Sequence, residues 1–332
     1  MRDVANLADV SQRTVSNVVN DYRYVKPETR ARVQKAIETL RYRPNVSAQK
    51  LRHGRTGVVG LAVPDISAAY FAELADHVQR QAAARGITLL IDQTGGLRDR
   101  ETLVLDAYQN NLIDGLILSP QTIIPSELTS RDLSFPTVWL GESIDHAGVP
   151  HISIDNVVAA AAATTHLLDT GRRAIATLGT MPDPDEPGPG QRRRRGYTNA
   201  LHEAGVEVDP LLMFTEPIWT LPSGQSAVDR LRESSTKVDA VFCFNDALAI
   251  GLLQGLHQHG IRVPDDIAVV GWDDIEFAAF TTPTLTTIAP DKAEIARLAV
   301  EHLLGQLDGV PLQSTEVTAG HCLVVRESSA SR

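Results

Sequence analysis

The sequence has few cysteines and no long apolar run, and each shortage argues against a class of protein. Two cysteines, Cys243 and Cys322, occur among 332 residues, and neither stands at a spacing typical of zinc ligands. We therefore expect two free thiols in a reducing compartment rather than a disulfide framework. No run of 18 apolar residues is present, so we expect no membrane span. The first ten residues also lack the apolar segment of a secretion signal.

Motifs typical of enzymes are missing as well. The sequence contains no G-x-G-x-x-G after an expected strand, no G-x-x-x-x-G-K-[ST] and no G-x-S-x-G. Its histidines and acidic residues do not cluster at metal-ligand spacing. We therefore expect no catalytic site, no metal and no cofactor. A nucleotide- or sugar-processing enzyme remains an alternative, but it would need one of these signatures.

The net charge of −10 conceals an uneven distribution along the chain. Residues 1–57 contain 12 Lys and Arg against 5 Asp and Glu, a balance of +7, so the remainder carries −17. Because phosphate neutralisation is a local effect, a basic module on an acidic body suggests nucleic-acid binding by the module alone.

Three short helices are expected within the basic module. The segment DVANLADV, residues 3–10, places apolar residues on one side of a helix. Ser11 can cap a second helix, SQRTVSNVVN, and Pro27 is a favourable first residue for a third, PETRARVQKAIETL. This order of elements predicts a helix-turn-helix unit, although any small three-helix bundle with solvated Arg and Gln would share the pattern.

The second helix has a polar face suited to reading bases. Val15, Val18 and Val19 face inward in the expected helix, whereas Gln12 and Arg13 begin it on the outer side. Arg matches guanine and Gln or Asn matches adenine in the major groove. The candidate DNA-binding residues of this unit are Ser11, Gln12, Arg13, Thr14, Ser16 and Asn17.

Three motifs in order, DVANLADVSQRTVSNVVN, VKPETRARVQKAI and YRPNVSAQKLR, resemble the head of the lac/gal repressor family of bacterial transcription regulators. The resemblance implies a helix-turn-helix domain over residues 1–43 and a hinge helix with its linker over 44–56. Family members usually have residues before the position of Asp3, including a Ser or Thr that caps the first helix. Here Met1 and Arg2 stand before Asp3, so either the start codon is misassigned or the first helix is poorly capped.

The expected hinge helix, from Asn45 to Leu51, has only about two turns and should be marginal alone in water. Ordering seven residues costs roughly 7–14 kcal/mol, and the segment has little apolar surface to offset this cost. The resemblance implies that two such helices of a dimer meet in the minor groove, where Leu51 wedges into the central base step beside Ala48. It also places Asn45 and Arg52 at the DNA. The alternative is a passive tether.

Beyond residue 57, expected strands and helices alternate. GVVGLAVPD, ITLLIDQT, DGLILSP, AIATLGT, DAVFCFND and IAVVGWDD read as buried strands, with helical segments between them. This alternation predicts an α/β fold of parallel sheets covered by helices on both faces, arranged as two lobes. Ligands in such sheets bind at the carboxyl ends of strands, here Pro64-Asp65, Asn245-Asp246 and Trp272-Asp273-Asp274.

The body resembles the two-lobed, periplasmic-binding-protein-like core of the same family, through YFAEL, ISIDN, RGYTNAL, FCFNDALAIGLL, VVGWDDIEFAAFTTPTLTTI and LVVRESS. The resemblance implies lobes of about 57–155 plus 290–313, and 156–289 plus 314–328. It also implies an effector in the cleft between them. An aromatic platform with Arg, Asn and Asp suits the apolar face and hydroxyls of a sugar. The matching residues are Tyr70, Phe71, Arg193, Trp219, Asn245, Asp246 and Asp273. Packing in the core is the alternative role for Tyr70 or Trp219.

Two features leave the effector open. The loop MPDPDEPGPGQ, residues 181–191, has an uncertain path near the cleft, and Gly141-Glu142 stands where relatives often place a charged ligand. We expect a cytoplasmic, homodimeric repressor of carbohydrate-utilisation genes that binds a pseudo-palindromic operator. A purine or another small metabolite is the alternative effector. A solute-binding protein for sugar transport is the alternative of another class, but it would need a signal peptide and no basic head.

Overall fold

The computed structural model describes residues 1–19, 22–42, 55–107, 112–123, 135–141, 149–183, 188–311 and 314–330. The chain forms two compact units, Met1–Gly57 and Val58–Arg332.

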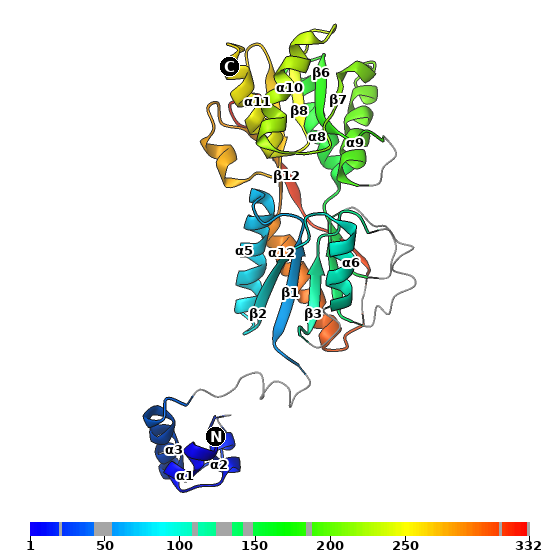
Figure 1. Cartoon of the computed structure of the whole chain (residues 1–332). Helices are drawn as coiled ribbons and strands as arrows, with labels where there is room; N and C mark the ends of the chain where they lie inside the picture. The colour runs from blue at the N-terminus through cyan, green and yellow to red at the C-terminus, as the bar shows by residue number, and fades with distance from the viewer. Residues whose placement is uncertain are drawn as a thin grey trace. The chain divides into compact units, whose positions relative to one another are not determined.

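Three helices around a small apolar core form the first unit (Figure 1). These helices are α1 (Arg2–Ala8), α2 (Gln12–Val19) and α3 (Pro27–Thr39). The buried residues at their centre are Val4, Ala5, Ala8, Val15, Val18, Val33 and Ala36. The expected three-helix unit is thereby confirmed.

Local signals explain where these helices begin and end. Asp9 adopts a left-handed conformation, with φ of 48°, and ends α1 with a tight turn. The Ser11 hydroxyl accepts a hydrogen bond from the Thr14 backbone N–H at 3.1 Å, so Ser11 caps α2 as expected. Pro27 is the first residue of α3. Met1, the residue before α1, makes no side-chain capping bond to it within the described residues.

The second unit contains two six-stranded sheets (Figure 1). In the first sheet the strand order is β11-β5-β4-β3-β1-β2, and all the pairings are parallel. The strands of this sheet are β1 (Val58–Val63), β2 (Thr88–Gln93), β3 (Gly115–Leu118), β4 (Thr137–Leu140), β5 (His151–Ser153) and β11 (Glu316–Thr318). The helices that accompany it are α5 (Ala69–Ala83), α6 (Arg98–Ala107) and α12 (Lys292–Leu307).

The second sheet has the order β12-β10-β9-β8-β6-β7 and is parallel except for the antiparallel pair β10–β12. Its strands are β6 (Ile175–Thr180), β7 (Met213–Thr215), β8 (Ala240–Cys243), β9 (Ala268–Trp272), β10 (Thr286–Pro290) and β12 (His321–Val324). The helices that accompany it are α8 (Asn156–Asp169), α9 (Pro189–Glu203), α10 (Leu221–Glu233) and α11 (Asp246–Gln258), with short 3-10 helices η2 (Pro210–Leu212) and η3 (Glu276–Phe280).

In the central strands β1, β3, β4, β6, β8 and β9, the alternation of side chains buries both faces of each sheet. In β1, Leu61 packs with α5 and α12, whereas Ala62 packs with α6. In β8, Phe242 packs with α8 and α9, whereas Val241 packs with α10 and α11. The α/β fold with two lobes of helix-covered sheets is therefore confirmed.

The chain crosses between the lobes three times. The first crossing follows β5, which ends at Ser153, and the second follows β10, which ends at Pro290. The third comes later than the expected boundary at 313/314, because β11 pairs in parallel with β5 of the first sheet. Residues Glu316–Thr318 thus belong to the first lobe, and the chain enters the second lobe only at β12 (His321–Val324).

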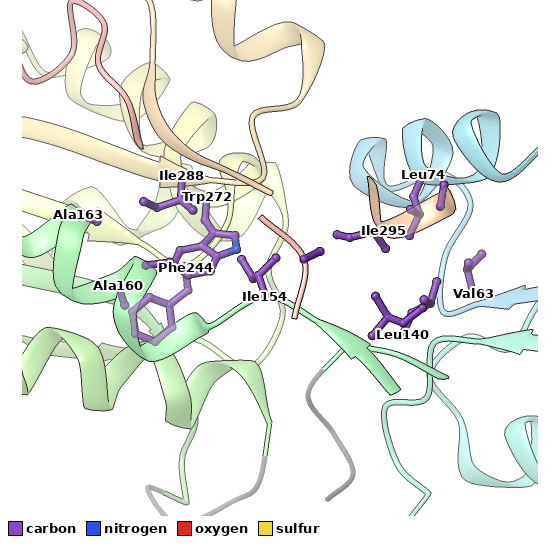
Figure 2. Packing of buried hydrophobic residues seen from close by; sticks show 14 of the residues in the cluster. Val63, Leu74, Leu140, Ile154, Ala160, Ala163, Phe244, Trp272, Ile288 and Ile295 are labelled. Carbon is purple, nitrogen blue, oxygen red and sulfur yellow. The ribbon is translucent and has the colours of Figure 1, made fainter. Parts of the chain in front are cut away.

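One apolar cluster continues from one lobe to the other. Figure 2 shows Leu74, Leu140 and Ile295 of the first lobe facing Trp272 and Phe244 of the second, with Ile154 at the crossing between them. The helices that carry these residues, and the ends of the strands beside them, surround the candidate site.

Candidate functional site

A cavity of about 230 Å³ lies between the two lobes of the second unit. Most of its lining comes from the carboxyl ends of strands β3, β4, β5, β8 and β9 and from the helices that follow, as expected for doubly wound sheets. Six of the seven predicted effector residues line it, namely Tyr70, Phe71, Arg193, Trp219, Asn245 and Asp273. The structure therefore brings together residues that lie up to 203 positions apart in the sequence.

Arg193 is a buried, rigidly held cation in the cavity wall. Its Nε donates to Asn156 Oδ1 at 2.8 Å, and its Nη1 donates to the Phe244 carbonyl. The guanidinium carbon lies 4.0 Å from the centre of the Trp272 ring and 5.3 Å from that of Trp219. These contacts stabilise a desolvated positive charge and fix its direction.

The position of Arg193 depends on the close approach of α9 to α8. A Cβ on Gly196 would lie 2.2 Å from the Val157 carbonyl oxygen, so only glycine allows this helix crossing. Gly196 lies one turn beyond Arg193 on α9, and Asn156 begins α8. The glycine thus brings the arginine within reach of its asparagine partner.

Asp273 is the acidic counterpart of Arg193. It follows β9 with a φ of 118°, an uncommon backbone conformation for a residue with a side chain. Burial raises the pKa of Asp273 well above its ordinary value, and the nearby Arg193 charge opposes this shift. A ligand that donates hydrogen bonds to the carboxylate would favour its ionised form.

Asn245 and Trp219 support each other at another part of the wall. The Asn245 side-chain oxygen caps α11 by accepting from the Leu248 N–H at 2.8 Å, and its Nδ2 donates to the Trp219 carbonyl at 3.2 Å. Trp219 Nε1 donates to the Glu216 carbonyl at 2.9 Å. The asparagine therefore holds the segment that carries the tryptophan as well as lining the cavity.

Tyr70 and Phe71 provide an aromatic surface from the first lobe. They are the second and third residues of α5, and their ring centres lie 5.2 Å apart in an edge-to-face arrangement. Both line the cavity and also pack against the apolar cluster. Packing and ligand contact are thus compatible roles for these two residues.

The remaining predicted residue, Asp246, does not line the cavity as far as the structure describes its wall. Its carboxylate is completely buried and accepts hydrogen bonds from Thr287 Oγ1 at 2.7 Å and from the Ile275 N–H at 3.0 Å. Consecutive residues at a strand end point in different directions, so Asn245 faces the cavity and Asp246 faces the core. Burial raises the pKa of Asp246 to about 6, and these two hydrogen bonds oppose the shift.

Several polar residues of the cavity wall were not expected from the sequence. Ser119 follows β3, Ser153 ends β5, and Gln121 lies two residues beyond Ser119. Trp272, which belongs to one of the strand ends that the sequence indicated, also lines the cavity. The rule that ligands bind at carboxyl ends of strands, applied to DGLILSP and ISIDN as it was to the later strands, would have found both serines.

The candidate DNA-binding surface belongs to the first unit. Ser11, Gln12 and Arg13 are exposed at the beginning of α2, and Thr14, Ser16 and Asn17 are half-buried. The Thr14 and Ser11 hydroxyls lie 2.9 Å apart, which orders the first turn. The other predicted contacts, Asn45, Ala48, Leu51 and Arg52, lie outside the described residues, as does Glu142.

Among the helices of the described residues, none is both long and apolar enough to cross a bilayer. Across the same part of the chain, no three His, Cys, Asp or Glu side chains are grouped so that they could hold a metal ion.

Comparison with known proteins assigns both units. Residues 1–45 match the family model of bacterial regulatory proteins of the lacI family, and residues 164–329 match that of a periplasmic binding protein-like domain. The ribose operon repressor of Escherichia coli K12 is 33% identical over 331 residues, which cover 99% of each chain.

Solved structures agree with this assignment. A structure from Sanguibacter keddieii, assigned to the LacI family of transcriptional regulators, is 40% identical with a TM-score of 0.76 and covers 84% of this chain and 100% of its own. The transcriptional regulator CelR in complex with cellobiose is 29% identical with a TM-score of 0.74 and covers 98% of each chain. The chain belongs to the lacI family of bacterial regulatory proteins.

Proposed function

We propose that this protein is a ligand-responsive transcriptional repressor that binds a pseudo-palindromic operator as a homodimer in the cytoplasm and has no enzymatic activity. The observation that carries the proposal is the combination of two sites in one chain. The basic first unit presents Gln12 and Arg13 at the beginning of α2, and the second unit encloses a cavity that contains Arg193 and Asp273. A transport protein would need only the second of these units.

The cavity favours a small, neutral ligand with several hydroxyl groups. Among its described lining residues, Arg193 is the basic side chain and Asp273 the acidic one, so no cluster of like charge lines the cavity. Its 230 Å³ is below the roughly 300–1,000 Å³ typical of pockets for drug-sized molecules, which favours a single ring over a longer oligosaccharide. Tyr70, Phe71 and Trp219 offer apolar surface to the face of such a ring. A monosaccharide meets these requirements.

A purine base is the second candidate, and the aromatic lining supports it. The rings of Tyr70, Phe71 and Trp219 would also suit the flat face of a base. Asp273 would accept from a ring N–H, and Arg193 would donate to a ring carbonyl. The two classes of effector differ in shape and can be separated by direct binding measurements.

The response to the effector is proposed to act through the hinge, residues 44–56. Asn45, Ala48, Leu51 and Arg52 would order on the operator, with Leu51 wedged into the minor groove. The two lobes would set how readily this ordering occurs. A coupling free energy of about 1–3 kcal/mol is typical and would change operator occupancy roughly 5- to 150-fold.

Thermal-shift screening of the full chain tests the effector. D-Ribose, D-glucose, D-galactose, cellobiose, hypoxanthine and guanine form an informative panel, because they separate single sugars, a disaccharide and purines. A bound compound at about 100 times its Kd stabilises the protein by about 2.7 kcal/mol. We expect a monosaccharide to give the largest shift, and a larger shift with hypoxanthine would favour the purine alternative.

Selection from a pool of random DNA duplexes tests the regulator itself. We expect enrichment of one inverted repeat with half-sites one helical turn apart, because a two-fold dimer presents two copies of α2. Binding should weaken steeply as salt rises, since the first unit contacts phosphates. Absence of any enriched sequence would contradict the proposed function.

A further inference from the structure

A half-buried ion pair in the first lobe also holds the backbone of the second lobe. Glu73 lies on α5, and Lys292 is the first residue of α12. Lys292 Nζ lies 2.6 Å from Glu73 Oε2, and the two side chains are 10% and 27% exposed. Because α5 and α12 pack against each other, this ion pair by itself belongs to one lobe.

Each member of the pair makes further hydrogen bonds across the boundary between the lobes. Lys292 Nζ donates to the carbonyls of Asp273 and Asp274, both at 2.8 Å. Glu73 Oε1 accepts from the Glu276 backbone N–H at 2.8 Å. An ammonium group has three N–H donors, so Lys292 uses all of them: one on Glu73 and two on the second lobe.

The carbonyls that Lys292 binds belong to an unusual turn. Asp273 and Asp274 have φ angles of 118° and 46°, a region that residues with side chains rarely adopt and that surrounding contacts must maintain. Arg326 also holds this turn, through a 2.7 Å bond to the Asp274 carboxylate. The Asp273 side chain projects from the same turn into the cavity wall. Lys292 thus fixes the two peptide groups that flank Asp274, namely the Asp273–Asp274 and Asp274–Ile275 peptides.

We propose that Glu73 and Lys292 form an inter-lobe latch that positions the Asp273 carboxylate and ties its turn to the first lobe. Lys292 is a positioning residue in this arrangement. A displacement of the Asp273 turn must either break three hydrogen bonds or carry α5 and α12 with it. The latch therefore converts a displacement of the cavity wall into a change in the position of one lobe relative to the other.

An ordinary ion pair on the same helix offers the contrast. Arg297 Nη1 lies 2.7 Å from Glu301 Oε2 on α12, and these side chains are 43% and 42% exposed. Neither makes a described contact with the second lobe, and exposed pairs of this kind contribute little to stability. Arg297→Met removes the same charge from the same helix as Lys292→Met, so it is a matched control.

Hydrogen–deuterium exchange of the full-length protein, without ligand or DNA, tests the latch. The Glu276 N–H reports directly, because its acceptor is Glu73. We expect Lys292→Met and Glu73→Gln each to accelerate exchange of the Glu276 amide at least roughly fivefold, the lower end of couplings between sites, measured in a peptide that begins several residues before Glu276. Lys292→Arg, which keeps the charge and several donors, should retain most of the protection against exchange. Arg297→Met should leave the protection unchanged.

The double variant shows whether the two residues act as one unit. Glu73→Gln with Lys292→Met should exchange no faster than Lys292→Met alone, because the second change removes an interaction already lost. Unchanged protection in both single variants would overturn the latch, as would independent effects that multiply in the double variant. If Lys292→Met accelerates exchange throughout the second unit, the exchange pattern of Glu73→Gln decides whether the effect is local or general. Acceleration throughout the second unit in Glu73→Gln as well would show that the pair supports the whole unit, and this would overturn the proposal.

These outcomes are separate from those of the proposed function. The exchange measurement requires neither an effector nor an operator, so a failed screen or selection would leave its result standing. Conversely, a protein that responds to a sugar but shows unchanged protection at Glu276 would retain the proposed function and lose the latch.

Discussion

At the residue scale, Arg193 lines the cavity and also makes several contacts with other groups of the protein. Its Nε and Nη1 bond to Asn156 and to the Phe244 carbonyl, and its planar group lies over Trp272. A lysine at this position would keep the charge but lose the planar group and the bond geometry. Arg193→Lys should therefore lower the affinity for the strongest compound of the panel at least tenfold, measured by calorimetric titration.

The neighbouring arginines provide the control for this prediction. Arg195 is exposed on the same helix, so Arg195→Lys should leave the titration unchanged. Thermal unfolding of both variants without ligand separates a lost contact from a damaged fold. Equal affinities for Arg193→Lys and the natural protein would remove Arg193 from the binding surface.

Asp246 predicts an unusual dependence of stability on pH. Burial raises the pKa of its carboxyl to about 6 in the folded protein, above its ordinary 3.8. The folded state therefore binds this proton more tightly than the unfolded state does. The resulting stabilisation is fully present below pH 3.8 and is lost as the pH rises through about 6. The contribution of Asp246 to the free energy of unfolding thus falls between these values.

Asp246→Asn should flatten this part of the profile. An amide has no proton to lose here, and it can still accept from the Ile275 N–H while donating to Thr287 Oγ1. Urea unfolding at pH 4 and pH 6.5 measures the difference. The pKa of Asp273 is raised in the same direction, so part of the slope should remain. An identical slope in both proteins would show that Asp246 does not titrate in this range.

At the element scale, the sequence predicts most of the architecture because local signals and burial agree. The cap at Ser11, the proline that begins α3 and the buried strands all appear where periodicity and capping chemistry place them. β11 escaped this reading because its three residues are largely exposed and are held mainly by backbone pairing with β5. A short edge strand of this kind has no hydrophobic pattern to find.

The same limit applies to the candidate site. Position at a strand end identified Asn245 and Asp273, because the topology fixes where strand ends meet. It did not show that Asp246 turns toward Thr287, a partner 41 residues later. The latch residues Glu73 and Lys292 were also invisible, since their partners in the second lobe are backbone groups.

The crossing of α10 and α11 gives a prediction for two helices as a unit. A Cβ on Gly251 would lie 2.0 Å from the Leu221 carbonyl oxygen, so the helices would have to separate. Gly251→Ala should lower the free energy of unfolding by at least about 2 kcal/mol, as expected for overpacking against backbone. Urea unfolding measures the change.

Gly305, a glycine in the last turn of α12, is the matched control. The nearest described neighbour of a Cβ there would be the Val310 Cβ at 3.9 Å, an ordinary contact. Gly305→Ala should raise the free energy of unfolding by about 0.5–1 kcal/mol, because alanine is the better helix former. A Gly251→Ala protein as stable as Gly305→Ala would show that the α10–α11 crossing can relax.

At the scale of the whole molecule, the basic charge and the buried cavity lie in different units. The positive balance of +7 lies in residues 1–57, and the acidic remainder contains the cavity. A ligand in the cavity can therefore influence the operator only through a change in the protein, since the two sites are in separate units. Such an influence is a coupling free energy and must act equally in both directions.

Reciprocity gives the prediction for the intact protein. The strongest panel compound should change operator affinity by some factor within roughly 5- to 150-fold, measured by fluorescence anisotropy of a labelled duplex. A saturating operator should then change the affinity for that compound by the same factor, measured by calorimetry at the same salt concentration. The sign of the change distinguishes an inducer, which weakens operator binding, from a corepressor, which strengthens it.

Asp273→Asn should abolish the change in operator affinity that the compound causes, because Asp273 lies in the cavity wall of the second unit. Operator affinity without the compound should stay unchanged. A compound that binds tightly yet leaves operator affinity unaltered would contradict a ligand-responsive repressor, since a ligand with equal affinity for both states shifts neither.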